Sequence, residues 1–150
     1  MRHRSRAVAL ALASLAVVGG ANPETPADVT VVVTGLRNDR GVVRACMTRT
    51  AERFPNCDDA AASYNAVTKA ASGASLTFRD VKPGRYAIAL LHDENGNGKA
   101  DRAAMMIPTE GFGFSRDAKV RFGPPRFDAA AFDVAAGSSE RIAIRMRYML

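Results

Sequence analysis

Short stretches of alternating apolar and polar residues run through this chain, and they limit its fold more than any other feature. Alternation with a period of two is typical of a strand that buries one face. It is clearest in four segments: Asp28–Leu36, Val42–Thr48, Arg85–Leu91 and a last strand in which Ile142, Ile144, Met146 and Tyr148 share a face. No segment of useful length has the period of a helix. The pattern therefore predicts an all-β protein.

Weaker segments and turns complete the predicted fold. Tyr64–Ala70 and Ala74–Phe78 are further strand candidates, and Phe127–Val134 is either a strand or a segment that includes a short helical turn. The turn residues of Arg37–Gly41 predict a hairpin between the first two strands, and Asp80–Gly84 predicts another turn. About seven short strands without a second domain favour a single antiparallel β-sandwich.

The N-terminal segment has the composition of a cleavable signal peptide. Three arginines precede the apolar run Ala7–Val18, and the small residues Gly19–Ala21 follow it. The run is 12 residues long, whereas a membrane anchor needs about 20. A buried N-terminal helix is the alternative, but it would not require the cationic start. We expect a signal peptide over residues 1–21, a linker over 22–27 and the sandwich over 28–150. The location is then periplasmic or secreted, without a transmembrane anchor after cleavage near Ala21.

Cleavage would also change the balance of charge. The whole chain has 21 Lys and Arg residues against 15 Asp and Glu residues, and three of the arginines lie in the signal segment. The remaining chain therefore has a net charge of 21 − 3 − 15 = +3. Such a modest excess, without a basic cluster that contains aromatic residues, argues against nucleic acid as a partner.

Two cysteines, Cys46 and Cys57, remain after the signal segment. An even number of cysteines in an exported protein favours a disulfide. This bond would close a loop of about 12 residues and stabilise the fold by roughly 3 kcal/mol. A metal-binding pair and two free thiols are the alternatives.

A long segment, residues 92–126, interrupts the alternation, and we expect any function to reside there. Structureless loops beyond about 15 residues are uncommon in compact domains and are often functional. The segment begins like a calcium-binding loop, in which alternate residues surround a hard cation with oxygen atoms. Positions 1, 3, 5, 7 and 9 of that pattern are Asp93, Asn95, Asn97, Lys99 and Asp101. Gly98 stands where the pattern requires a sharp turn.

The match to the calcium-binding pattern is incomplete. Ala104 occupies the position of the bidentate carboxylate, and Glu110 can replace that group only if the chain folds back. So few carboxylates predict weak affinity, with a dissociation constant of roughly 10⁻⁴–10⁻³ M. The alternative is a turn rich in Gly and Asn, whose side chains cap their own backbone.

The rest of the long segment combines aromatic residues with glycine and proline. Phe112, Phe114 and Phe122 either line a shallow recognition surface or pin the segment onto the sandwich by burying their rings. His92 is the only histidine after the signal segment, and its neighbour Asp93 and the later Ser115 raise the question of a hydrolase. Ser115 lacks the G-x-S-x-G context of a nucleophile. We therefore expect His92 to be a structural hydrogen-bonding residue.

The order of several motifs resembles that of a known family. The motifs V-x-V-x-G-L-R-N-D-R-G, H-D-E-N-G-N-G-K, G-F-G-F-S and R-F-G-P-P lie between about Val29 and Tyr148. They resemble domain-of-unknown-function family 2141, an uncharacterised family of exported bacterial proteins. The resemblance implies an immunoglobulin-like or transthyretin-like sandwich in the cell envelope. It carries no established activity and therefore implies no catalytic residues.

The sequence thus predicts an exported, non-enzymatic β-sandwich protein of the bacterial envelope with a weak calcium-binding loop. Its expected partner is an envelope protein or a small ligand. The alternative is a ligand-binding module that recognises a peptide or a glycan through the Gly- and Phe-rich part of the long segment. An uncharacterised hydrolase is a third, weaker reading.

Overall fold

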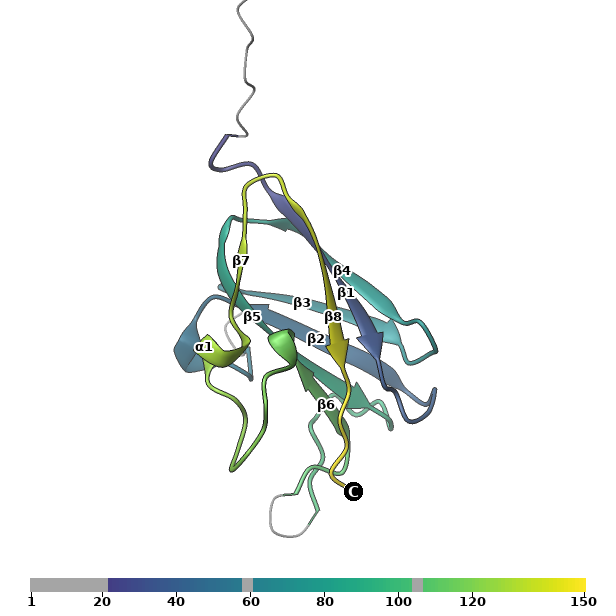
Figure 1. Ribbon diagram of the computed structural model, residues 1–150. Helices are drawn as coiled ribbons and strands as arrows, with labels where there is room; N and C mark the ends of the chain where they lie inside the picture. The colour runs from purple at the N-terminus through teal and green to yellow at the C-terminus, as the bar shows by residue number, and fades with distance from the viewer. Residues whose placement is uncertain (1–21, 58–60, 104–106) are drawn as a thin grey trace, which may run out of the picture.

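The described part of the chain folds into eight strands arranged in two sheets, with almost no helix (Figure 1). This computed structural model describes residues 22–57, 61–103 and 107–150. The strands are β1 (Ala27–Thr34), β2 (Val42–Thr48), β3 (Ser63–Lys69), β4 (Ser75–Val81), β5 (Gly84–Asp93), β6 (Gly111–Phe114), β7 (Phe132–Val134) and β8 (Ser139–Arg145). Short helical turns are η1 (Ala51–Arg53), η3 (Ser115–Asp117) and α1 (Phe127–Ala130). The predicted signal segment and Ala104 lie outside the described residues.

The two sheets pack against each other around one apolar core, which confirms the β-sandwich. One sheet has the order β4-β1-β8, and the other has the order β3-β2-β5-β6 with β7 added beside β5. Alternate residues of β1, Val29, Val31 and Val33, are buried against the core, as their period of two requires. Ile88 of β5 and Ile144 of β8 belong to the same core cluster. Within the described residues no helix is long and apolar enough to cross a membrane.

The predicted hairpin between the first two strands is wrong. Strand β1 pairs with β4 and β8, whereas β2 pairs with β3 and β5 in the other sheet. The Arg37–Gly41 segment therefore carries the chain from one sheet to the other. The alternation correctly places the valines of β1 on a buried face, but it contains no information about the strand that lies beside them.

The prediction of a purely antiparallel arrangement is also wrong, because β1 and β8 run parallel. Their register extends from Asp28 opposite Ser139 to Thr34 opposite Arg145. A parallel pair needs a long connection, and here the connection is most of the domain. The strand count is eight because the short strand β6 interrupts the long segment. The segment Phe127–Val134 contains the short helical turn that was one of its two predicted structures, and its strand begins only at Phe132.

The predicted disulfide is confirmed. Cys46 of β2 is bonded to Cys57, and their Cα atoms lie 6.0 Å apart. The bond ties the irregular segment after β2 back onto a central strand of the larger sheet. It thus fixes the position of Phe54, whose ring packs edge-on against Phe114 at a centroid distance of 5.8 Å.

The two sheets also meet where β6 lies against the segment after β8. The Phe112 N–H donates to the Arg147 carbonyl at 3.0 Å, and the Arg147 N–H donates to the Phe112 carbonyl at 2.8 Å. A Cβ atom on Gly111 would lie 2.3 Å from the Tyr148 ring, and one on Gly113 would lie 2.9 Å from the Arg145 carbonyl oxygen. The two glycines of the G-F-G-F motif therefore permit this close approach.

Candidate functional site

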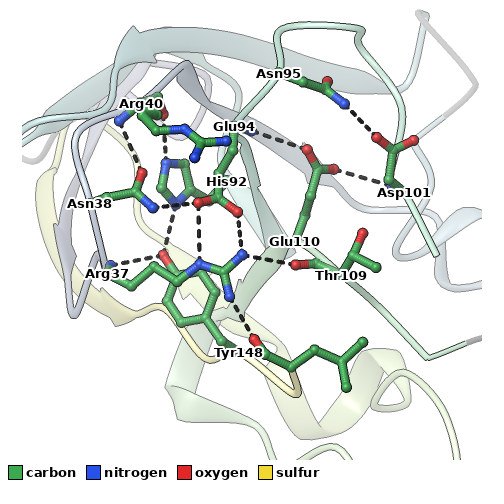
Figure 2. Close-up of polar contacts among 11 residues, drawn as sticks. Arg37, Asn38, Arg40, His92, Glu94, Asn95, Asp101, Thr109, Glu110 and Tyr148 are labelled. Atoms are coloured by element: carbon green, nitrogen blue, oxygen red, sulfur yellow. Dashed lines mark hydrogen bonds and ion pairs between the residues drawn. The ribbon is translucent and has the colours of Figure 1, made fainter. Parts of the chain in front are cut away.

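The candidate site is a group of polar residues at the end of β5, where the strand passes into the long segment (Figure 2). We call the residues 93–110 the β5–β6 loop. Two parts of the chain contact it, the Arg37–Gly41 segment and Arg44 of β2, and the C-terminal segment contacts the adjacent His92 through Tyr148. These parts are far apart in sequence. The fold brings them together because β2 and β6 both flank β5.

Asp93 lies at the centre of the first turn of the loop and is fully buried. Its Oδ2 atom accepts a hydrogen bond from Arg44 Nε at 2.6 Å and one from the Gly98 N–H at 2.9 Å, while Oδ1 accepts from the Asn97 N–H at 3.1 Å. Burial alone would raise the pKa of Asp93. The hydrogen bonds from Arg44, Gly98 and Gly96 outweigh that effect, and the pKa lies below its ordinary value. The buried carboxylate is therefore charged and organises the turn.

The other predicted calcium ligands lie around the same turn. The side-chain amide of Asn97 donates to both oxygens of Asp101, at 3.0 and 2.9 Å, and the amide of Asn95 donates to Asp101 Oδ2 at 2.6 Å. The Lys99 N–H donates to Asn97 Oδ1 at 2.8 Å. Gly98 has a φ of +76°, which agrees with the sharp turn expected there. All five positions thus belong to one compact, hydrogen-bonded turn.

Glu110 folds back onto this turn. The sequence required this return if Glu110 was to replace the missing carboxylate of the calcium-binding pattern. Its side chain is buried, with 5% exposure. Oε1 accepts from the Glu94 N–H at 3.0 Å, and Oε2 accepts from the Asp101 N–H at 3.1 Å (Figure 2). A single carboxylate therefore holds both ends of the 94–101 stretch. The return is made by a narrow hairpin, in which the Thr109 N–H donates to the Asp101 carbonyl at 3.0 Å.

The donor set of this turn fits a calcium ion only in part. Each carboxylate oxygen carries two lone pairs, so the oxygens of Asp93 and Glu110 retain acceptor capacity beside their backbone hydrogen bonds. The guanidinium of Arg44, however, already neutralises Asp93. Among the described residues no three His, Cys, Asp or Glu side chains gather as a metal-binding group. A cation here would therefore depend on amide and backbone oxygens, which calcium accepts.

Arg37 is the centre of a second set of contacts, beside the turn. Its guanidinium pairs through two nitrogens with the carboxylate of Glu94, and Nη2 also donates to the Thr109 carbonyl at 3.0 Å. Nη1 donates to the Leu150 carbonyl at 2.6 Å. The guanidinium carbon lies 4.5 Å from the centroid of the Tyr148 ring. Arg37 thus joins the β5–β6 loop to the C-terminal segment.

Glu94 is held in its charged form by these contacts. Its side chain is only 8% exposed. The hydrogen bond from Arg37 is the largest influence, and together with the amide of Asn38 it overcomes the effect of burial and lowers the pKa of Glu94 to about 2. The same hydrogen bond raises the pKa of the Arg37 guanidinium. The pair is therefore fully ionised at neutral pH.

His92 is a buried residue, and both of its ring nitrogens have hydrogen-bond partners. Nε2 lies 2.8 Å from the Arg40 carbonyl oxygen, which can only accept, so Nε2 carries a proton. Nδ1 shares a second hydrogen bond with the Tyr148 hydroxyl, at 2.7 Å. The Tyr148 oxygen in turn accepts the Arg37 N–H at 3.2 Å. Both ring nitrogens are thus engaged in hydrogen bonds within the fold.

Ser115 and the three phenylalanines of the long segment differ in burial and do not form one site. Ser115 is fully buried, where its Oγ accepts the Ile88 N–H at 2.9 Å and donates to the Ala130 carbonyl at 2.5 Å. Phe114 is buried and Phe112 half-buried in a second apolar cluster. Phe122 is fully exposed. The structure therefore brings Phe112 and Phe114 together, at a centroid distance of 6.0 Å, but leaves Phe122 apart from that cluster.

Several residues of the site have no clear signal in the sequence. Arg37 and Asn38 look like ordinary turn residues, and Arg44 like an outward residue of an alternating strand. Only the pairing of β2 with β5 brings Arg44 to Asp93. Tyr148 follows the alternation of the last strand, so the sequence predicts an inward ring but not its bond to His92.

A family model described as "Uncharacterized protein conserved in bacteria (DUF2141)" matches residues 31–142. The chain belongs to this family. The resemblance seen in the motifs is thereby confirmed. The region matched by the DUF2141 model contains the disulfide and the whole β5–β6 loop, while Tyr148 lies beyond its end.

Comparisons with individual proteins add little. No curated protein matches the chain. Among solved structures, a pilus-presented adhesin, Spy0125 (Cpa), is similar over 83% of this chain at 13% identity, with a TM-score of 0.36. The similarity covers 28% of the adhesin's own chain. At this identity and TM-score, the adhesin supports no conclusion about the DUF2141 chain.

Proposed function

We propose that the protein is an exported, non-enzymatic β-sandwich of the bacterial envelope whose β5–β6 loop binds calcium weakly and presents this end of the domain to a partner. The signal-like segment supports export, and the family description supports a bacterial source. The immunoglobulin-like or transthyretin-like classification belongs to the same proposal. The observation that carries the calcium part is the return of Glu110 onto the turn organised by Asp93.

That return supplies a carboxylate which the continuous sequence pattern lacks. A weak calcium loop needs oxygen atoms that are already directed toward one turn, because each ordered side chain costs conformational entropy. Here Asp93, Asn97 and Asp101 are held by hydrogen bonds within the turn, and Glu110 fixes its two ends. The charge of Arg44 opposes a cation at Asp93, which agrees with an affinity in the weak range, roughly 10⁻⁴–10⁻³ M.

The absence of enzymatic activity is the second part of the proposal. It is supported by the placement of the only two groups that raised the question of a hydrolase. His92 uses both ring nitrogens internally, and Ser115 both accepts and donates within the core. Two surface depressions of about 420 and 530 Å³ are not lined by His92.

Calcium titration of the chain without residues 1–21 tests the calcium part. Because calcium would bind only the folded state, we expect the melting temperature to rise by a few degrees at several millimolar calcium. Asp101→Asn should abolish most of this rise, because it removes a half-buried carboxylate from the turn without disturbing the Asp93–Arg44 pair. Asp133→Asn is the matched control, since Asp133 is an exposed aspartate of β7. An unchanged melting temperature in calcium, or equal rises in both variants, would contradict the proposal.

The alternative function, recognition of a peptide or a glycan by Phe112, Phe114 and Phe122, receives less support. Phe114 is buried, and Phe112 is half-buried in the same cluster. Both rings pin the chain onto the sandwich. Only Phe122 offers a free ring, so these three residues do not supply a shared recognition surface.

A further inference from the structure

The segment Lys119–Arg126, which we call the RFGPP loop, projects from the molecule. Phe122 at its tip has a relative exposure of 107%, the highest among the four exposed large hydrophobic residues of the described chain. A Cβ atom added to the adjacent Gly123 would meet nothing within 4 Å. Figure 1 shows the chain between η3 and α1 extending away from the strands. The ring therefore stands in solvent without neighbours.

The base of the RFGPP loop is fixed although its tip is free. Ala118 and Pro125 are buried at its two ends. The Ala118 carbonyl accepts a hydrogen bond from Arg147 Nη1 at 3.3 Å, and its N–H donates to the Ser115 carbonyl at 3.3 Å. The second apolar cluster beside the loop is already filled by other rings, including Phe54, Phe112, Phe114 and Phe127. The fold thus holds Phe122 outward rather than packing it.

The RFGPP loop is also basic, which corrects the expectation from the sequence that no basic cluster contains an aromatic residue. Lys119, Arg121 and Arg126 are exposed, and the loop contains no acidic residue. The acidic residues on either side are engaged elsewhere: Asp117 pairs with Arg147 at 3.1 Å, and Asp128 lies 3.8 Å from Arg85. None of the three loop cations has an ion-pair partner within the described part of the chain. The tip therefore combines one free aromatic ring with three uncompensated positive charges.

We infer that the RFGPP loop docks this protein on an anionic lipid surface. Phe122 enters the apolar layer just below the headgroups, while Lys119, Arg121 and Arg126 face the anionic headgroups. The charges are complementary to such a surface, which attracts basic residues within about a Debye length. A single ring flanked by cations matches the apolar and basic composition of interfacial membrane anchors.

A protein partner fits these observations less well. Hot-spot residues at protein interfaces are surrounded by further contact residues that exclude water, whereas Phe122 is the single exposed large hydrophobic residue of the RFGPP loop. A lipid interface needs no complementary rim, because the acyl chains close around an inserted ring. The C-terminal segment, with the exposed Met149 and Leu150, lies at the same end of the molecule in Figure 1. Arg147 of the same segment contacts the base of the RFGPP loop through the Ala118 carbonyl.

The absence of tryptophan from the chain permits a direct test. Phe122→Trp would be the sole tryptophan fluorophore, and Val67→Trp is the matched control, because Val67 is an exposed residue of β3. With vesicles of phosphatidylcholine and phosphatidylglycerol at millimolar lipid, we expect a blue shift for Phe122→Trp and quenching by brominated acyl chains. Val67→Trp should show neither effect.

Vesicle sedimentation measures the contribution of each group. Phe122→Ala should weaken the partition coefficient by about 30-fold, through loss of the inserted ring. Arg121→Gln should weaken it by about fivefold and reduce its dependence on salt, whereas Arg141→Gln on β8 should leave it unchanged. All these side chains are exposed, so the melting temperatures of the variants should match that of the unaltered protein.

Three outcomes would overturn the inference. These are failure of the unaltered chain to sediment with anionic vesicles, equal binding by Phe122→Ala, and equal binding to vesicles of phosphatidylcholine alone. The test requires no calcium, and Asp101→Asn should not change it in calcium-free buffer. Failure of the calcium proposal and failure of this inference are therefore distinguishable.

Discussion

Strand β5 passes through two regions that are both closed to solvent. Along its middle, Tyr86, Ile88 and Leu90 contact the apolar core shared by the two sheets. At its end, His92 and Asp93 are just as buried, but hydrogen bonds from several other segments surround them. An apolar core accepts residues of similar volume with modest cost. A buried polar group needs a partner in a particular direction, and the cost of leaving it unpaired is large.

The comparison predicts that substitutions near the polar end of β5 cost more stability than substitutions in its apolar middle. This should hold even for a glycine that packs against the polar end. A Cβ atom on Gly41 would lie 2.0 Å from the Asp93 carbonyl oxygen, and the φ of Gly41 is +67°. Gly41→Ala should therefore lower the free energy of unfolding by about 4 kcal/mol. Gly73 is the control, because its φ is +75° and nothing lies within 4 Å. Gly73→Ala should cost about 1 kcal/mol. Equal losses of unfolding free energy for Gly41→Ala and Gly73→Ala, measured by urea denaturation, would contradict this prediction.

The apolar middle should respond to a change of volume. Ile88 is fully buried between the sheets. Ile88→Ala should lower the free energy of unfolding by about 3 kcal/mol, because it removes apolar contacts and leaves a cavity. Ile88→Val should cost only about 1 kcal/mol. Val67→Ala, at an exposed position of β3, is the control and should stay within about 0.5 kcal/mol of the unaltered protein. Denaturation by urea measures all three.

The Arg37–Glu94 pair should contribute less to the free energy of unfolding than Gly41 or Ile88, because Arg37 is partly open to water. Arg37→Ala should lower the free energy of unfolding by about 2 kcal/mol, since it leaves Glu94 without its main partner. Arg37→Lys keeps the charge but loses the two-nitrogen contact, and should recover only part of the loss. Hydrogen exchange should show faster opening of the β5–β6 loop in Arg37→Ala. Full recovery by lysine would show that charge alone is required.

The acid limb of the stability curve tests the same ion pair from the side of Glu94. The pKa of Glu94 is about 2 in the folded chain, below its value in an unfolded chain, about 4.3. The carboxylate therefore stabilises the fold above about pH 4.3, and this contribution is lost as the pH falls toward 2. Glu94→Gln should flatten the acid limb of the stability curve over that window. If the variant lost stability at low pH in the same way as the unaltered protein, other carboxylates, such as Asp93, would determine the acid dependence.

The sequence predicted the apolar part of this molecule better than the polar part, for a physical reason. Alternation reports which residues face a core, and it located β1, β2, β5 and β8 well. It does not report which strand lies alongside, so the predicted hairpin at Arg37–Gly41 was wrong, and the predicted antiparallel sandwich missed the parallel pair of β1 and β8. Both errors concern pairing between distant segments rather than burial.

The candidate site shows the same limit. The spacing from Asp93 to Asp101 predicted a compact turn, and the structure has one. Glu110 was named as a substitute carboxylate, but its return depends on a hairpin that no local pattern encodes. Arg37 and Tyr148 are separated by 111 residues, and only the completed fold brings them together. Hydrogen-bond partners at this distance depend on tertiary geometry, which spacing alone does not contain.

The parallel pairing of β1 and β8 has a mechanical consequence. Because the two strands run in the same direction, the start of β1 and the end of β8 lie at opposite ends of the strand pair. Tension applied between Ala27 and Arg145 would pull β1 and β8 past each other along their length. The hydrogen bonds of the pair, from Asp28 opposite Ser139 to Thr34 opposite Arg145, would then be loaded together in shear rather than broken one by one. This geometry would make the domain resist stretching more strongly than a sheet that unzips from one end.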